Sequence, residues 1–194
     1  MRMFSVRVTT IIPIFIFIIC SALFIFASKN VQAVTLSAAQ DVYSHGRKPD
    51  TNINDSYLRV RSWGPSDSYI QFNTSTLNGS NIDSASLVIK VLEVKKAGTM
   101  QLRTVDTSWD ENTLTFNNQP NYSNPIVSIP VVASDLGKTV SIDVTSVVQD
   151  WSNGSSNFGI ALTADEMNIR IGSKEGGAPA QLDVSTSDGS VPNV

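Results

Sequence analysis

The sequence predicts an all-β sandwich that carries one short helix. Segments in which apolar and polar residues alternate recur along the chain, roughly ten in number. Glycine, proline, asparagine and aspartate residues separate these segments at short intervals. No internal repeat or linker interrupts the series. This pattern is typical of two antiparallel sheets packed face to face.

The alternation predicts which way the side chains of each strand point. In residues 57–63, Leu58 and Val60 share one face, and the aromatic and basic residues share the other. Residues 125–133 contain Pro130, which predicts an edge strand or a bulge. The other expected strands span 69–73, 85–94, 98–105, 113–116, 138–146, 158–164, 168–174 and 180–186.

One helix is expected within residues 143–154. Thr145 or Ser146 is suited to cap its N-terminus. Val147, Val148 and Trp151 share one side at helical spacing, and Asn153-Gly154 ends the helix. We expect this helix to cover one end of the sandwich, with the Trp151 side chain buried between the helix and the sheets.

The first 33 residues have the composition of a secretory signal peptide. Arg2 and Arg7 precede an apolar run from Val8 to Ala27, and Val31-Gln32-Ala33 supplies a cleavage site after Ala33. Because the run is long enough to span a bilayer, an uncleaved membrane anchor is the alternative. The expected domain covers 34–185, and the polar segment 186–194 is expected to be a loose tail.

The chain is acidic outside this leader. The whole chain has a net charge of −3, and the leader holds three bases and no acid, so the remaining 161 residues carry −6. This charge argues against nucleic acid as a partner. Cys20 is the only cysteine and His45 the only histidine, which excludes a disulfide or a multi-histidine metal centre after the leader.

Asp110 and Glu111 form an acid pair in "SWDENTLTFNNQP", residues 108–120. A glycosidase needs two carboxylates that face each other across a sugar, whereas neighbouring side chains diverge in an extended chain. We therefore interpret the stretch as structural. Trp109 and Phe116 are expected to pack, while Glu111 and Asn117 or Asn118 hydrogen-bond the backbone at a corner.

Four stretches together carry a resemblance to a known family. They are "AAQDVYSHGRKPDTNINDSYLRV" (38–60), "SWDENTLTFNNQP" (108–120), "SIDVTSVVQDWSNGSSNFGIAL" (141–162) and "IGSKEGGAPAQLDV" (171–184). They resemble the DNRLRE-type domain, grouped with carbohydrate-binding module family 96 and related to disaggregatase repeats. The resemblance implies a secreted or displayed jelly-roll-like β-sandwich with alginate-like acidic glycans as a ligand class. Phe116 and Asn54 depart from the family pattern, which has tryptophan and glycine there.

Basic and aromatic residues point outward from several expected strands. One interpretation is scattered solvated positions. The other is a single basic-aromatic sheet face, because arginine binds carboxylates in bidentate fashion and aromatic rings stack on sugars. The candidate ligand-binding residues are Tyr57, Arg59, Arg61, Trp63, Lys90, Arg103 and Arg170.

Oxygen-bearing side chains gather in the segment between the first two strands. Asp41, Asn52 and Asp55 are candidate ligands for a structural calcium ion, with Asp50 and Asn54 nearby. The spacing is not that of an EF-hand, and loops rich in Asn and Asp also form ordinary turns.

The sequence thus predicts a secreted or cell-surface, non-catalytic, monomeric module that binds an acidic polysaccharide. Contact with a membrane is expected only through an uncleaved N-terminal segment. A structural or adhesive cell-surface or matrix protein with the same fold is the alternative. A small hydrolase or lyase is the third hypothesis, disfavoured because the chain has one histidine and no nucleophile motif.

Overall fold

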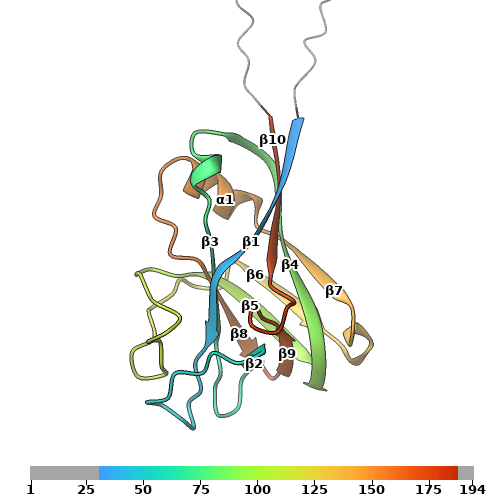
Figure 1. Ribbon diagram of the computed structural model, residues 1–194. Helices are drawn as coiled ribbons and strands as arrows, with labels where there is room; N and C mark the ends of the chain where they lie inside the picture. Colours follow the sequence, from blue (N-terminus) through green and yellow to red (C-terminus); the bar gives the residue numbers. More distant parts are fainter. Residues whose placement is uncertain (1–30, 188–194) are drawn as a thin grey trace, which may run out of the picture.

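The computed structural model describes residues 31–187 as an antiparallel β-sandwich with one α-helix, which confirms the predicted fold class (Figure 1). The first five strands are β1 (Val31–Tyr43), β2 (Tyr57–Arg61), β3 (Ser68–Phe72), β4 (Asn81–Lys96) and β5 (Gly98–Thr104). They are followed by β6 (Val127–Val131), β7 (Thr139–Asp143), β8 (Ile160–Asp165), β9 (Asn168–Gly172) and β10 (Gln181–Ser187). The helix α1 spans Thr145–Ser152, and the short 3-10 turns are η1 (Ser75–Leu77) and η2 (Ala133–Asp135).

The long strand β1 joins the two layers of the sandwich. Its first half pairs with β10, its second half pairs with β3, and the register shifts between Ala38 and Gln40. One layer continues from β10 to β4, β9 and β2, with β7 on β4. The other continues from β3 to β8, β5 and β6. Within the described residues β6 pairs only with β5, so Pro130 lies on an edge strand as predicted.

The main hydrophobic core lies between the two layers. Leu58 and Val60 are buried there, as the alternation in β2 predicts. Ile169 and Ile171, their partners in β9, are fully buried and extend the same inner face. Since Tyr57, Arg59 and Arg170 alternate with these residues, their side chains point to the outer face.

A second, smaller apolar cluster lies on the outer face of the other layer. Val42, Tyr69 and Ala161 are buried there beneath the segment between β5 and β6. Leu114 inserts into this cluster, and the Trp109 ring packs at 5.9 Å from that of Tyr69. The prediction of a strand at 113–116 is therefore wrong. Leu114 instead anchors the segment between β5 and β6, which we call the covering loop, and no residue of 113–116 is in a strand.

The helix forms where the sequence predicts it, and Trp151 is buried on its inner side. The expected cap is wrong, since Val144 occupies the N-cap position without a side-chain bond. The Thr145 hydroxyl instead contacts Asp143 Oδ1 at 2.6 Å and accepts the Ala85 amide at 2.9 Å. Thr145 thus fastens the helix to β4 and not to its own first turn.

The described domain extends beyond the expected limits at both ends. Val31 pairs with Ser187, so β1 begins before residue 34 and β10 ends after residue 185. Thr186 and Ser187, expected in the tail, are buried in β10. The expected leader lies outside the described residues except for Val31–Ala33, and cleavage after Ala33 stays a prediction. Within 31–187, no helix has the length and apolar character needed to cross a bilayer.

Candidate functional site

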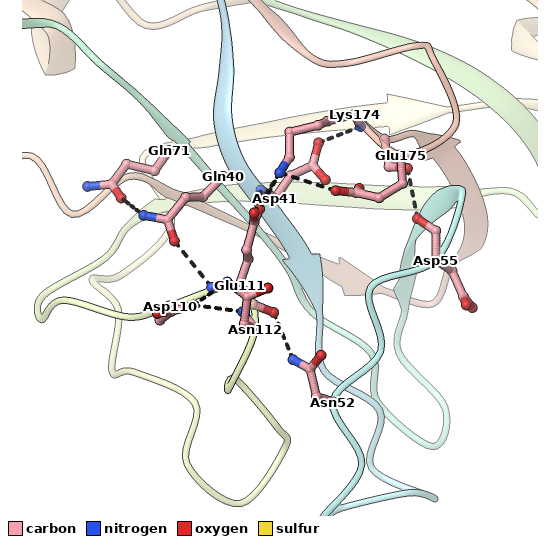
Figure 2. A network of polar contacts seen from close by, with 11 residues as sticks. Gln40, Asp41, Asn52, Asp55, Gln71, Asp110, Glu111, Asn112, Lys174 and Glu175 are labelled. Atoms are coloured by element: carbon pink, nitrogen blue, oxygen red, sulfur yellow. Dashed lines mark hydrogen bonds and ion pairs between the residues drawn. The ribbon is translucent and has the colours of Figure 1, made fainter.

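A partly buried polar network joins segments that are far apart in the sequence (Figure 2). The Glu111 carboxylate accepts the backbone N–H of Asp41 at 3.0 Å. The Lys174 ammonium donates to both oxygens of the same carboxylate, at 2.6 and 2.7 Å. The Glu111 N–H in turn donates to Gln40 Oε1 at 3.2 Å. Glu111 therefore ties the loop that covers the outer face to β1 and to the loop after β9.

A second carboxyl group of the network is fully buried. Asp41 accepts the Lys174 N–H at 2.9 Å through Oδ2. Burial, with the nearby Glu175 carboxyl group, raises the pKa of Asp41 to about 7. Burial also acts to raise the pKa of Glu175, but hydrogen bonds from the backbone, Asp41 and Lys174 outweigh it and lower that pKa. The two shifts are opposite in direction, so protonation near neutral pH is favoured at Asp41 and disfavoured at Glu175.

The loop after β9 approaches the loop before β2 closely at a glycine. A Cβ atom on Gly176 would lie 2.0 Å from the Ser56 carbonyl oxygen. Ser173 Oγ donates to the Asp55 carbonyl oxygen at 2.9 Å. The Asn54 amide, with its nitrogen turned toward Glu175, donates to that carboxylate at 3.2 Å. These contacts hold the loop between β1 and β2 in one shape.

The network supports the structural interpretation of the acid pair. Asp110 is exposed and accepts the Asn112 N–H at 2.8 Å, whereas Glu111 is paired with Lys174. The predicted backbone bonds are confirmed for Glu111 and for Asn118, whose amide donates to the Thr113 carbonyl oxygen at 3.0 Å. The Asn117 amide donates to Asp50 Oδ1 instead.

The three expected calcium ligands have other partners. Asp41 accepts the Lys174 N–H, the Asn52 amide nitrogen donates to two carbonyl oxygens, and Asp55 Oδ2 accepts the Tyr43 hydroxyl at 3.1 Å. Among residues 31–187, no three His, Cys, Asp or Glu side chains are grouped to hold a metal ion. The Lys174 ammonium supplies the positive charge beside these acids. Calcium stays a prediction that these contacts do not favour.

A cleft of about 560 Å³ lies between β2 and the loop that precedes it, and we call it the basic cleft. Its volume is within the range of small-ligand sites, about 300–1,000 Å³. It is lined by Tyr43, His45, Lys48, Thr51, Asn52, Ile53, Asn54, Asp55, Tyr57 and Arg59.

Two stacked tyrosines form one wall of the basic cleft. The rings of Tyr43 and Tyr57 lie 5.9 Å apart with an angle of 26° between their planes. The Arg170 guanidinium lies 4.1 Å from the centre of the Tyr57 ring, and that of Arg59 lies 5.8 Å from it. Arg59 and Arg170 are direct neighbours in the pairing of β2 with β9. Aromatic surface and positive charge therefore occur side by side.

Positive charge is concentrated around this cleft. Burial lowers the pKa of His45, and the nearby charges of Arg61, Arg59 and Lys48 lower it further. Burial, Arg59 and Arg47 lower the pKa of Arg61 in the same way. Within 31–187, the side chains of Arg59 and Lys48 make no hydrogen bond or ion pair, and Nε of Arg59 is buried without a partner. These two cations are available to an anionic ligand.

The predicted ligand residues do not form one face. Tyr57 and Arg59 line the basic cleft, and Arg170 lies beside them but is paired with Glu93, its Nε 3.1 Å from Oε2. Lys90 is exposed on β4 where that strand pairs with β7. Arg103 lies on the other layer, where it donates to Thr163, Ser123 and Gln101.

The hairpin after β2 turns the remaining two candidates away from their expected positions. Arg61 is buried, and its guanidinium donates to the Gly64 carbonyl oxygen. The reason is that β2 ends at Arg61, where the chain folds back on itself through the Arg61–Ser66 bridge. Trp63 is 75% exposed at the tip, with the Arg47 guanidinium 4.3 Å from its ring centre.

Sequence reasoning did not name Tyr43, His45 and Lys48 as ligand-binding residues. They come from the end of β1 and the following loop, whose acids and amides indicated a metal site or turns, and the stretch between His45 and Asp55 was only the second choice for the glycan site. The signal that could have identified them is the run of bases His45, Arg47 and Lys48 beside an aromatic residue. The pairing of β1 with β3, continued by backbone hydrogen bonds from Ser44 to Asp67 and from Gly46 to Pro65, brings this run beside the β2–β3 hairpin, and the sequence does not display that pairing.

A β-sandwich with an aromatic and basic cleft at one end has the form of a sugar-binding module. The chain belongs to carbohydrate-binding module family 96, whose model matches residues 32–186. A gellan lyase from Bacillus sp. is 32% identical over 137 residues, which are 66% of this chain. The match spans only 6% of the length of that lyase.

Proposed function

We propose that this chain is a secreted, non-catalytic module that binds an acidic polysaccharide through the basic cleft. The observation that carries the proposal is the pair of unpartnered cations, Arg59 and Lys48, beside the Tyr43–Tyr57 stack. A guanidinium binds a carboxylate through two parallel hydrogen bonds, and an aromatic face packs on the apolar face of a sugar ring. The cleft therefore matches both parts of a uronate unit.

Because the chain is acidic overall, the concentration of bases around the basic cleft supports an anionic ligand. The protein is acidic overall, yet four cations and the histidine cluster at one end of the sandwich. Solvated bases on an acidic protein are expected near acids, whereas Arg59 and Lys48 have no acidic partner among the described residues. The similarity to a gellan lyase agrees with this proposal, because gellan is an acidic polysaccharide.

The contacts of the cleft argue for binding without turnover. Burial, Tyr57 and Asp55 raise the pKa of Tyr43, so its phenolate is not populated at neutral pH and cannot act as a base. Glu111 is held by Lys174, and Asp110 is an exposed turn residue. Of the groups that line the cleft, His45, whose pKa is lowered, is the one that could act as a base, so the search for an unsaturated product in the experiment below decides between binding and turnover.

Affinity electrophoresis tests the proposal directly. The chain from Val31, which holds every described strand and both apolar clusters, is run through gels that contain alginate, gellan or a neutral glucan. We expect retardation by the acidic polymers that weakens as salt is added, because exposed ionic contacts are screened. No unsaturated uronate product should accumulate, and the protein should elute as a monomer on size exclusion.

Failure of alginate and gellan to retard the chain, or retardation by them that salt leaves unchanged, would overturn the acidic ligand. Formation of unsaturated product would show a lyase. Self-association without retardation by any glycan would favour a structural or adhesive role.

A further inference from the structure

A second cleft lies at the other end of the sandwich from the basic cleft. It has a volume of about 730 Å³ and lies between the end of α1 and the end of β3. Phe72 pairs with Ala38 at one end of the β1–β3 ladder, and Ser68 pairs with Tyr43 at the other. Four residue steps along β3 separate these two ends, which at about 3.3 Å per residue is roughly 13 Å. Figure 1 shows α1 and β2 at opposite ends of the molecule.

The lining of this cleft contains no charged residue, and we call it the amide cleft. Asparagine, glutamine, serine and threonine side chains surround two aromatic rings. The lining residues are Ala39, Gln71, Phe72, Asn73, Thr74, Ser75, Asn78, Trp151, Ser152, Asn153, Gly154, Ser155 and Asn157.

The floor of the amide cleft is fixed before any ligand arrives. Trp151 and Phe72 are packed into the main core. The Asn157 amide donates to the Phe72 carbonyl oxygen at 3.0 Å and to Thr74 Oγ1 at 2.9 Å. Ser152 Oγ lies 2.6 Å from the Leu77 carbonyl oxygen. A floor held in this way loses little conformational freedom on binding, which favours affinity.

The rim offers hydrogen-bonding groups that the described part of the chain does not use. Asn78 and the hydroxyls of Ser75 and Ser155 have no side-chain partner within 31–187. Asn73 and Asn153 each accept one hydrogen bond through Oδ1, from the Ser75 N–H and from Gln149 Nε2, which leaves their amide nitrogens as donors. The rim therefore has both donors and acceptors, all of them uncharged.

From these features we infer that the amide cleft is a second carbohydrate site, which binds an uncharged sugar unit. Sugar hydroxyls both donate and accept, so they match amides and hydroxyls. A uronate carboxylate would lose hydration there without gaining a cation, which is unfavourable. This site is separate from the basic cleft. One chain would then bind an acidic sugar unit at the basic cleft and an uncharged sugar unit at the amide cleft.

NMR of the asparagine side-chain amides tests the inference. The chain from Val31 is titrated with cello-, manno- and galacto-tetraose, and separately with a uronate tetrasaccharide. We expect at least one neutral tetrasaccharide to shift the amide signals of Asn73, Asn78 and Asn153, and the uronate to leave them in place. No shift with any of the neutral probes at the highest soluble concentration would overturn the inference.

Variants separate this site from the basic cleft. Asn78→Ala with Ser155→Ala removes two rim groups whose side chains make no hydrogen bond within the described residues, and should weaken neutral-sugar binding about tenfold. Asn121→Ala, an exposed asparagine away from the cleft, is the matched control and should bind as wild type does. Arg59→Ala should leave neutral binding unchanged. Unweakened binding by the double variant, or neutral-sugar shifts that map to Tyr57 and Arg59, would contradict the inference.

Discussion

The Lys174 ammonium lies 2.6 Å from Glu111 Oε1 and 2.7 Å from Oε2. The two residues are 63 positions apart, in the covering loop and in the loop after β9. The hydrogen bonds that the Lys174 ammonium donates to Glu111 raise the pKa of Lys174, so the lysine is charged at neutral pH. The pair therefore fastens the covering loop to the end of the sandwich that carries the basic cleft.

Glu111→Gln should reduce the free energy of unfolding by about 1–3 kcal/mol, because it removes the charge from the carboxylate that binds Lys174 through both oxygens and leaves Glu175, 3.2 Å away, as the remaining counter-charge. Asp110→Asn, the adjacent acid, is the matched control and should change it by less than about 0.5 kcal/mol. Urea denaturation measures both. Equal losses for the two variants would show that the pair has no special role.

Trp151→Ala should destabilise the fold by roughly 3–5 kcal/mol, because it removes a large side chain from between helix and sheets. Trp63→Ala makes the same truncation at a 75% exposed site and should have little effect. Thermal denaturation followed by circular dichroism compares them. A thermal midpoint for Trp151→Ala equal to that of wild type would contradict the conclusion that the buried Trp151 side chain stabilises the fold.

The fold itself was largely predictable from the sequence because alternation reports which side chains are buried. Leu58 and Val60 face the core as expected, and Pro130 marks an edge. The failure at 113–116 has a physical cause. Leu114 is buried by a loop that lies on the outside of a sheet, and one apolar residue in a polar stretch does not distinguish such a loop from a strand.

The candidate site was predictable only in part. Tyr57 and Arg59 were found because strand alternation puts them outside. Arg103 and Arg61 have the same pattern, but local acceptors such as the Ser123 and Gly64 carbonyl oxygens satisfy them. Whether an outward arginine is free or bound depends on neighbouring loops, and the sequence does not display those contacts.

Because of Asp41, the free energy of unfolding should decrease as pH rises. Its pKa is raised from 3.8 to about 7, so the folded state retains a proton that the unfolded chain releases. Its contribution to stability is complete below its unfolded pKa and is lost as pH rises through about 7. Asp67, with a pKa raised by burial to about 6, acts in the same direction.

Asp41→Asn should reduce the decrease in stability that accompanies rising pH. An asparagine there keeps an acceptor for the Lys174 N–H and is uncharged at every pH, as protonated Asp41 is. Between about pH 5 and 8, the variant should lose about 2 kcal/mol less stability than wild type, and Asp67 should account for the remaining decline. Parallel stability curves for the two proteins over this range would show that Asp41 does not retain a proton on folding.

The affinity of a charge-matched pair of variants for alginate tests the central claim most directly. Arg59→Ala with Lys48→Ala removes the two unpartnered cations of the basic cleft, whereas Lys90→Ala with Lys138→Ala removes two exposed cations elsewhere. The cleft variant should bind alginate at least about tenfold more weakly and with a smaller salt dependence, since it lacks two charge-assisted contacts. The control should bind close to wild type, and both should unfold at the wild-type midpoint. Equal loss in the two variants, or no loss in the cleft variant, would contradict the assignment of acidic-polysaccharide binding to this cleft.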